Sequence, residues 1–407
     1  MAQLGGQQVT LRSLVPSVFL PTVVFEVGNG AVAPILALTA LELGASPAIA
    51  GLIVALLGIG QLGGNVPAAA VVNRIGDRRA MIISAGLAGA AMTVSYFAGH
   101  VLVLAASTLF IGACGATFGL ARHSFMTIVV PAPIRAAALS TVGGSHRIGL
   151  FIGPFLGAAV IAATHERAAF LIAVGACLAT MLILLVVPEP PHADAFARRP
   201  KETATLTAVW REHGRLLLTL GLAIFAIGAV RAARPTVVPL WADHIGLDAQ
   251  TTSVIFGIGA AVDMALFYPA GRAMDRWGRL SVSLPSMLLM GGAMALVPLT
   301  TGATSLIMVA IAMGIGNGLG SGIVMTLGAD VAPRDATVRF LAQWRLMGDT
   351  GHAAGPLLVS AVTTLATLGA GIVSAGMLGL FAAAAIARWA PLYSPYATRE
   401  MVRARSG

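Results

Sequence analysis

Several long apolar stretches of this 407-residue chain contain side chains that can carry charge. An ionisable residue inside an apolar, membrane-spanning segment costs about 3 kcal/mol on insertion scales, so such residues are the first candidates for functional chemistry. Carboxylic acids can take up and release protons, and arginines can bind anions. The candidates are Glu26, Arg122, His123, His146, Arg147, Arg231, Arg234, Asp263, Arg345, Asp349 and His352.

The composition of the whole chain explains why these residues stand out. Hydrophobic residues make up 57% of the sequence and charged residues 10%, whereas roughly a quarter of the positions in a soluble domain are charged. We therefore expect an integral membrane protein that lies in the lipid bilayer of an inner or plasma membrane. The 48 glycines fit this expectation, because small residues let membrane helices approach closely.

Other kinds of chemistry lack the residues that they would need. Lys201 is the only lysine, which excludes a Walker A phosphate loop. No cluster of His, Cys and carboxylate has the spacing of metal ligands, and no nucleophile elbow of the type G-x-S-x-G occurs. We therefore expect neither an enzyme nor a metal site. No cofactor is expected, and a proton gradient would be the energy source.

The second half of the chain repeats the first half at a shift of 202 residues. Two homologous halves of this length in an apolar chain are typical of membrane bundles with internal repeats. The shift places Pro67 on Pro269, Gly76 on Gly278, Gly112 on Gly314, Pro131 on Pro333, Gly153 on Gly355 and Pro154 on Pro356. Twelve apolar stretches of about 20 residues, six in each half, are candidate membrane helices. They begin near residues 14, 49, 80, 101, 137, 168, 216, 251, 281, 304, 340 and 368.

Basic residues are distributed unevenly between the two ends of these stretches. Of the 25 Lys and Arg residues, 19 fall at alternate ends, five lie within the stretches, and Arg167 alone lies at the opposite ends. The positive-inside rule therefore places both termini in the cytoplasm. This asymmetry explains the net charge of +9, so no nucleic-acid partner is expected. We predict a first bundle over residues 1–188, a cytoplasmic linker over 189–215 and a second bundle over 216–407.

The loop after the eighth stretch has the sequence GRAMDRWGR, and a degraded copy with Asn73 in place of the aspartate follows the second stretch. The loop resembles the cytoplasmic motif G-x-x-x-D-R-x-G-R of the major facilitator superfamily. A loop carboxylate such as Asp275 can accept backbone N–H groups at a helix start and pair with arginine, which would hold one end of the bundle closed. The arginines could equally anchor the loop among anionic headgroups. The residues of this predicted cytoplasmic latch are Gly271, Asp275, Arg276, Gly278, Arg279, Arg74, Gly76 and Arg78.

The fifth stretch contains a motif of small residues, formed by Gly149, Gly153, Pro154 and Gly157. It resembles the helix-5 motif of proton-coupled exporters in the same superfamily. Pro154 removes one helical hydrogen bond, which allows either a bend or simply close packing. The resemblance extends over the whole chain. It implies an all-α membrane protein with 12 transmembrane helices, arranged as two six-helix bundles that are related by a pseudo-twofold axis.

The superfamily arrangement implies contacts between the two halves, because it places helix 5 beside helix 8 and helix 2 beside helix 11. Counted at 1.5 Å per residue, Arg147 and Asp263 both lie about 18 Å from the cytoplasmic surface. We therefore predict an ion pair between them. The 202-residue shift converts this pair into Asp349 and Gln61, and Arg345 lies one turn from Asp349. All five residues are assigned to coupling between the halves, with structural pairing as the alternative.

Glu26 has no opposite charge within its own helix, which the resemblance places at the central cavity. A lone buried carboxyl group can exchange a proton near neutral pH. Arg231, which the repeat aligns with Asn29 one turn from Glu26, is the expected partner in the other half, and pairing would instead keep the carboxylate ionised. Both arrangements remain open, and Arg122 and Arg234 are further candidates for anion contact. Polar packing is the expected role of His123, His146 and His352.

Three functions are consistent with these features. The favoured one is proton-coupled export, by antiport and alternating access, of a small and partly hydrophobic compound. The second is proton-coupled import of a small metabolite or organic anion, because the spans contain five arginines and three acids. The third is a membrane sensor without flux. The expected partners are a small-molecule substrate and protons, and a monomer would suffice.

Overall fold

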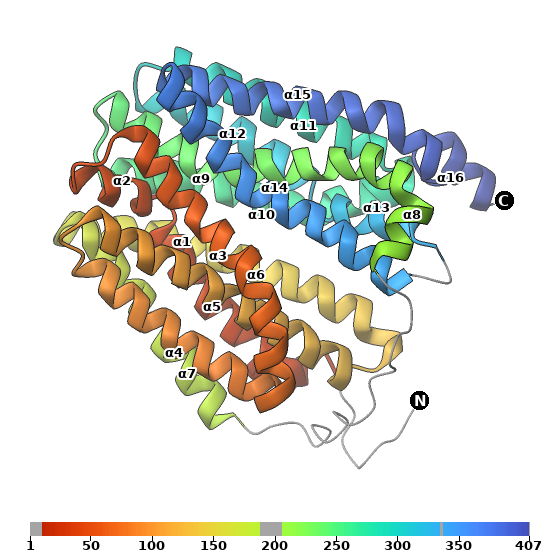
Figure 1. Ribbon diagram of the computed structural model, residues 1–407, viewed down its shortest axis with the longest axis horizontal. Helices are drawn as coiled ribbons and strands as arrows, with labels where there is room; N and C mark the ends of the chain where they lie inside the picture. The colour runs from red at the N-terminus through yellow and green to blue at the C-terminus, as the bar shows by residue number, and fades with distance from the viewer. Residues whose placement is uncertain (1–9, 188–205, 334–336, 407) are drawn as a thin grey trace.

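The computed structural model describes residues 10–187, 206–333 and 337–406, which form helices joined by short connections (Figure 1). The first half contains α1 (Leu20–Val32), α2 (Ile35–Glu42), α3 (Pro47–Ile75), α4 (Asp77–Tyr96), α5 (Val101–Val129), α6 (Ala132–Ala163) and α7 (Ala169–Val186). The second half contains α8 (Leu206–Leu216), α9 (Leu222–His244), α10 (Ala249–Trp277), α11 (Leu280–Leu296), α12 (Ala303–Leu319), α13 (Ile323–Val331), α14 (Thr337–Leu365), α15 (Leu368–Tyr393) and α16 (Arg399–Ser406). Short 3-10 or π-helical turns are η1 (Arg12–Leu14), η2 (Val15–Phe19), η3 (Glu166–Ala168), η5 (Leu217–Gly221) and η6 (Val297–Leu299). Most of the predicted linker over 189–215 lies outside the described residues, and α8 occupies its end.

The internal repeat of the sequence is visible in where the helices begin and end. α3 and α10 each contain 29 residues, and both their first and their last residues are 202 positions apart. The N-caps correspond as well, because Ser46 and Asp248 each accept a hydrogen bond from the backbone N–H three residues later. Both helices end at a glycine with positive φ, Gly76 at 90° and Gly278 at 89°. Equivalent sequence signals therefore give equivalent helices in the two halves.

Each half packs as a bundle, and the halves meet along two helix pairs. In the first half α1 lies against α6 and α7, and α3 against α5; in the second α9 lies against α14 and α15, and α10 against α12. Between the halves α6 lies against α10 and α3 against α14. These are the pairs of helices 5 and 8 and helices 2 and 11 that the resemblance to the superfamily implied. The ribbons of the halves are close at the end that carries α2 and diverge toward the end that carries α8 and α16 (Figure 1). A hydrogen bond of 2.7 Å from Ser360 Oγ to the carbonyl of Ala48 joins the halves in the α3–α14 contact.

Ten helical segments of the described residues are long and apolar enough to cross a membrane. The predicted spans that do not qualify are α4 and α14. α4 begins with Asp77, Arg78 and Arg79, and α14 contains Arg345 and Asp349. These charged residues shorten the uninterrupted apolar part of both helices. They nevertheless pack within the bundles, α4 against α5 and α7, and α14 against α9 and α3. The all-helical membrane fold is thus confirmed, whereas the count of twelve spans stays a prediction.

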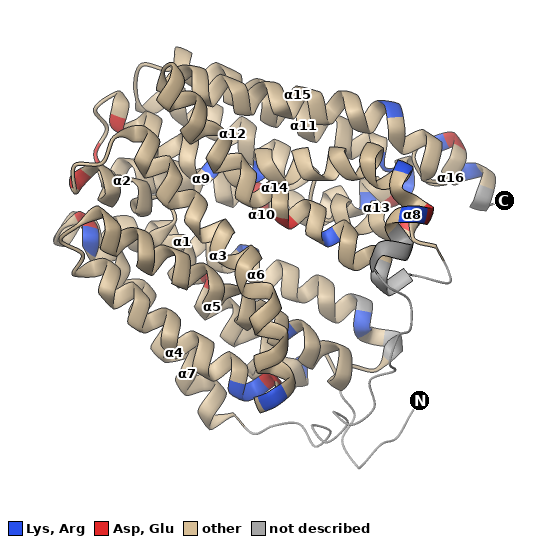
Figure 2. Cartoon of the chain, in the orientation of Figure 1, with Lys and Arg blue, Asp and Glu red and all other residues tan. Residues whose placement is uncertain are grey.

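The charged residues are arranged as expected for a membrane bundle. Figure 2 shows that most of the coloured Lys and Arg residues gather toward the end that carries α8 and α16, and that few lie along the middle of the helices. This is the end that the positive-inside rule assigns to the cytoplasm. The orientation itself stays a prediction.

The two capping glycines provide a direct test of how the helix connections are built. Only glycine adopts this backbone region readily, so Gly76→Ala is expected to lower the free energy of unfolding by about 1–3 kcal/mol. A methyl group at Gly278 would also lie 2.7 Å from the carbonyl carbon of Thr398, whereas no described atom lies within 4 Å of one at Gly76. Gly278→Ala should therefore cost more. Denaturant unfolding of both variants in detergent measures the difference, and equal losses would contradict the packing described for Gly278.

Candidate functional site

Glu26 lies at the centre of a polar cluster that is formed entirely by the first half. The residue is 7% exposed on α1, and its carboxylate accepts a hydrogen bond of 3.0 Å from Asn29 Nδ2. His146 Nδ1 on α6 lies 2.9 Å from Glu26 Oε1, and Arg122 Nη1 on α5 lies 3.9 Å from the same oxygen. One buried carboxylate is therefore contacted by three polar groups from three helices.

The small residues of α6 explain how Glu26 and His146 come together. A methyl group at Gly149 would lie 2.5 Å from the Cβ atom of Glu26 and 2.6 Å from the carbonyl oxygen of Val23. At Gly153 it would lie 2.6 Å from the backbone nitrogen of Ala31. Glycine at these positions lets the backbones of α1 and α6 approach closely. The predicted fifth helix is α6, so the helix-5 motif, which continues through Pro154 and Gly157, packs α6 against α1.

Arg122 is held beside Glu26 mainly by ring and charge contacts. Its guanidinium lies 5.9 Å from the ring centroid of Phe118, which stacks on Phe25 at 4.2 Å. The Nε and Nη1 atoms of Arg122 are buried and have no hydrogen-bond partner among the described residues. Arg122 therefore contributes positive charge next to Glu26 without the tight fork geometry of a bidentate ion pair.

One expectation for this cluster is wrong, and one contact was not predicted. Arg231 is not the partner of Glu26, because its Nη2 atom donates a hydrogen bond to the carbonyl of Gly320, within the second half. His146 makes the shortest contact with Glu26, and its side chain is 43% exposed. The sequence held one usable signal, since His146 lies one turn before Gly149, the first glycine of the helix-5 motif.

The predicted ion pair between the halves is present. Arg147 Nη1 on α6 lies 3.3 Å from Asp263 Oδ1 on α10. The pair is held from both sides, because Arg147 Nη2 donates to Ser321 Oγ at 2.6 Å and Asn317 Nδ2 donates to Asp263 Oδ2 at 2.7 Å. The ring of Phe267 lies under the guanidinium at 4.8 Å. The geometry is confirmed, and its role in coupling stays a prediction.

The second predicted contact between the halves takes a different form. Asp349 Oδ2 pairs with Arg345 Nε at 3.6 Å within α14, as the spacing predicted. Gln61 is exposed and, among the described residues, forms no hydrogen bond with Asp349. A cavity of about 470 Å³ separates the helices here, and its lining comprises Asn65, Ala69, Leu120, Trp210, Ala342, Gln343, Arg345, Leu346 and Asp349.

The predicted latch residues join helices within each half. Asp275 pairs with Arg279 at 3.1 Å, and Arg279 also pairs with Asp330 at 2.8 Å, a contact that the sequence analysis missed. Ile128 occupies the position of Asp330 in the first half, so the repeat gave no hint of it. Burial disfavours the charge of Arg279, but hydrogen bonds and charge from Asp330 and Asp275 outweigh this and raise the pKa of the guanidinium above its ordinary value.

In the first half, Arg78 ties α4 to the end of α7. Its Nε atom donates to the carbonyl of Leu184 at 2.8 Å, and its Nη2 atom donates to that of Val187. Arg74 and Arg276 are exposed, and Arg276 lies over the ring of Trp277. The described contacts of Arg78 and Arg279 therefore stay within one half. Their part in gating between the halves stays a prediction.

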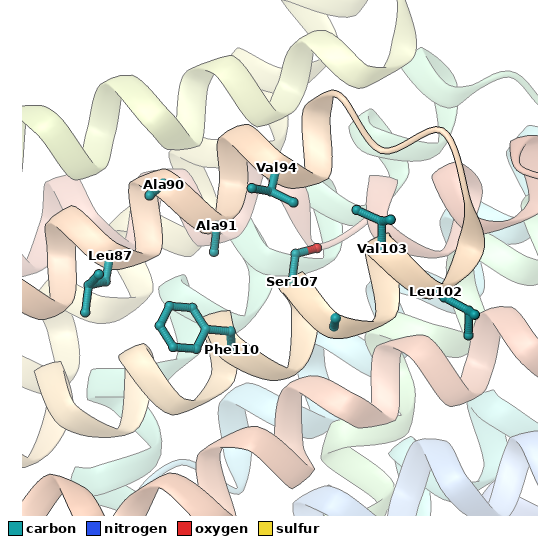
Figure 3. A pocket seen from close by; sticks show the side chains of 9 residues that line it. Leu87, Ala90, Ala91, Val94, Leu102, Val103, Ser107 and Phe110 are labelled. Atoms are coloured by element: carbon teal, nitrogen blue, oxygen red, sulfur yellow. The ribbon is translucent and has the colours of Figure 1, made fainter.

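An apolar groove on the outside of the first half lies apart from these polar residues. It has a volume of about 460 Å³ between α4 and α5 (Figure 3). Its lining comprises Leu87, Ala90, Ala91, Val94, Leu102, Val103, Ala106, Ser107 and Phe110. Ser107 is the one hydroxyl in this set, and its oxygen bonds to Leu104 and Ser95. Such a surface suits lipid chains rather than a charged ligand. Among the described residues, no group of three His, Cys, Asp or Glu side chains could hold a metal ion.

Gly149 offers a test of the α1–α6 contact that forms the Glu26 site. Gly149→Ala is expected to destabilise the protein by about 1–3 kcal/mol, because the added methyl group meets the backbone of α1. Gly144→Ala on the same helix is the matched control, since no described atom lies within 4 Å of its added methyl group. Unfolding of the two variants in detergent is the measurement. Similar stability of both would show that α1 and α6 are not in close contact at Glu26.

Comparison with solved structures places this arrangement among known transporter folds. A POT family transporter in complex with 5-aminolevulinic acid aligns with a TM-score of 0.73 at 13% identity, covering 94% of this chain and 96% of that chain. A bacterial homolog of the human lysosomal transporter Spinster, in an inward-facing and unoccupied conformation, gives 0.72 at 13% identity, with 93% and 97% covered. The human organic anion transporter MFSD10 (TETRAN) gives 0.65 at 15% identity, with 93% and 100% covered. At these identities the likeness concerns the fold alone.

Sequence comparison gives the same result. The uncharacterized MFS-type transporter YhjO of Bacillus subtilis (strain 168) is 22% identical over 301 residues, which are 74% of this chain and 74% of that protein. Residues 18–356 match the Major Facilitator Superfamily. The fold and this match, which spans both halves, agree with the loop motif, and the chain belongs to the Major Facilitator Superfamily of membrane transporters.

Proposed function

We propose that this transporter exports a small, partly hydrophobic compound in exchange for protons, and that Glu26 carries the proton. The observation that supports this most directly is the contact of 2.9 Å between Glu26 and His146. The Glu26 side chain is 9% exposed and that of His146 is 43% exposed. A titratable imidazole therefore connects a buried carboxyl group to the more accessible surface of α6.

A proton can pass between these two groups without a change in the protein backbone. When His146 takes up a proton at Nε2, the proton on Nδ1 can pass to the Glu26 carboxylate, which leaves a neutral imidazole and a carboxyl group that donates to Nδ1. Protonation of Glu26 would remove its attraction to Arg122 and weaken the link between α1 and α5. Loading of the proton would thus change how the helices around Glu26 are held together.

The position of His146 can link protonation of Glu26 to the contact between the two halves. His146 faces Glu26 within the first half, and the next residue, Arg147, pairs with Asp263 in the second half. A shift of α6 on protonation would move Arg147 relative to Asp263. This arrangement supports alternating access, in which the two halves rock about a site near the middle of the membrane.

The helix-5 motif, which lies on α6, favours export because it resembles the motif of proton-coupled exporters. Its glycines pack α6 against α1 at Glu26. The proposed energy source is the proton gradient, without a further cofactor, and a monomer contains all the residues invoked. The proposed location is an inner or plasma membrane. Both termini are proposed to lie in the cytoplasm, because basic residues gather at the end of the bundle that carries α8 and α16.

Proton-coupled import of an organic anion is the second candidate. It is favoured by the excess of positive charge around Asp263, where Arg147, Arg231 and Arg234 are all within electrostatic range. Import and export differ in the direction of the proton relative to the compound.

The test is proton movement in proteoliposomes that contain the purified protein, challenged with lipophilic cations, neutral drugs and small organic acids. Export predicts a compound-dependent proton flux opposite to the compound. Glu26→Gln should abolish this flux, because the amide keeps the shape of the side chain but cannot carry the proton. His146→Gln should slow it without abolishing it, since Glu26 remains.

Glu400→Gln, which changes an exposed carboxylate on α16, is the matched control and should leave the flux unchanged. A proton flux in the same direction as an organic acid would favour import instead. A flux that is the same in the wild type and in Glu26→Gln would rule out Glu26 as the proton carrier.

A further inference from the structure

The second half contains more buried positive charge than its acids can balance. Asp263 already bonds to Arg147 and to Asn317, so both of its oxygens are engaged. Arg231 and Arg234 on α9 are each within electrostatic range of Asp263 and of Arg147. Three guanidinium groups therefore share the charge of one carboxylate, and only Arg147 contacts it directly.

Both α9 arginines have donors without a partner. Arg231 donates from Nη2 to the carbonyl of Gly320, but its Nε atom is buried and has no hydrogen-bond partner among the described residues. The same is true of Arg234 Nη1, and the guanidinium of Arg234 lies over the ring of Phe256 at 5.2 Å. A buried charged donor that is left without an acceptor is strongly unfavourable. Arginines that served only to stabilise the fold would be expected to have acceptors within the protein.

The helix next to Arg231 is interrupted inside its membrane span. The span over Ala303–Val331 consists of α12, which ends at Leu319, and α13, which begins at Ile323. Gly322 between them has a φ of 77°. The corresponding first-half helix, α5, is continuous over Val101–Val129. The second half thus departs from the repeat at the point where Arg231 contacts it.

This interruption adds a second feature that favours an anion. The N-terminus of a helix presents backbone N–H groups and the positive end of the helix dipole, and interrupted membrane helices use such ends to bind anionic groups of substrates. Ser321, which lies in the break, also accepts the hydrogen bond from Arg147. Arg231 and Arg147 therefore both contact the break between α12 and α13, and Arg234 is within electrostatic range of Arg147.

From these observations we propose that Arg231 and Arg234 bind a carboxylate group of the transported compound. The proposal rests on the transport function above and names the class of substrate, an organic acid with an apolar body. A carboxylate matches the planar fork of a guanidinium group, and it would supply the acceptors that the two arginines lack. Phe267, which lies under Arg147 and is partly exposed, offers apolar surface for the rest of the molecule.

The experiment compares probes that share one body and differ only in charge. Binding of benzoate, benzamide and benzylamine, and of hexanoate, hexanamide and hexylamine, is measured by calorimetry on the purified protein in detergent, without a proton gradient. At least one carboxylate should bind, and its amide and amine should bind much more weakly. Arg231→Gln and Arg234→Gln should each weaken carboxylate binding roughly 30-fold or more.

Arg272→Gln is the matched control, because Arg272 is an exposed arginine that stacks on Tyr268 and should not affect binding. Arg234→Lys keeps the charge but loses the fork, so an intermediate affinity is expected. If the glutamine variants do not fold, the comparison of probes on the wild-type protein decides alone. An amine or amide that binds as tightly as its carboxylate, or the failure of both carboxylates to bind, would overturn the proposal.

Because binding is measured without a gradient, this result is independent of proton coupling. Carboxylate binding that depends on Arg231 and Arg234 would support the proposed site even if Glu26→Gln left the proton flux intact. Conversely, an antiport that depends on Glu26 but carries only amines would support the proposed function and overturn this assignment of substrate.

Discussion

The high cost of charge in an apolar membrane bundle is the constraint on which the rest of this structure depends. No water competes for a charged side chain there, so each such residue needs a partner inside the protein or a functional reason to lack one. Glu26 has Asn29, His146 and Arg122, and Asp263 has Arg147 and Asn317. These clusters fix which faces of α1, α5, α6 and α10 point toward one another.

α6 connects the two clusters because its neighbouring residues face different partners. His146 contacts Glu26 on α1, and Arg147 contacts Asp263 on α10. Such a division requires α6 to lie tightly against α1 on one side, which Gly149 and Gly153 permit. Small residues and charged residues thus act together. The small residues let the backbones approach closely, and the polar and charged side chains can then contact one another between the helices.

The two halves share a scaffold but not their polar chemistry. The N-caps, the helix ends and the capping glycines of α3 recur in α10 at a shift of 202 residues. The charges of the two clusters do not repeat, since Gln61 corresponds to Asp263 and Asn29 to Arg231. The continuous α5 corresponds to the interrupted pair α12 and α13. A symmetric scaffold allows the halves to move against each other, and the departures from symmetry carry the chemistry that we propose.

The sequence by itself determined the membrane environment and the helices, because hydrophobic length and the repeat are local or periodic signals. The neighbouring helix pairs were implied by the resemblance to the superfamily. Together with the depth of both residues, counted along straight helices, this resemblance predicted the Arg147–Asp263 pair. The partners of Glu26, the Arg279–Asp330 pair and the unpartnered donors of Arg231 and Arg234 were decided only by the tertiary structure. These depend on how far each helix is rotated about its axis and how closely it packs, and neither quantity is encoded in spacing along one helix.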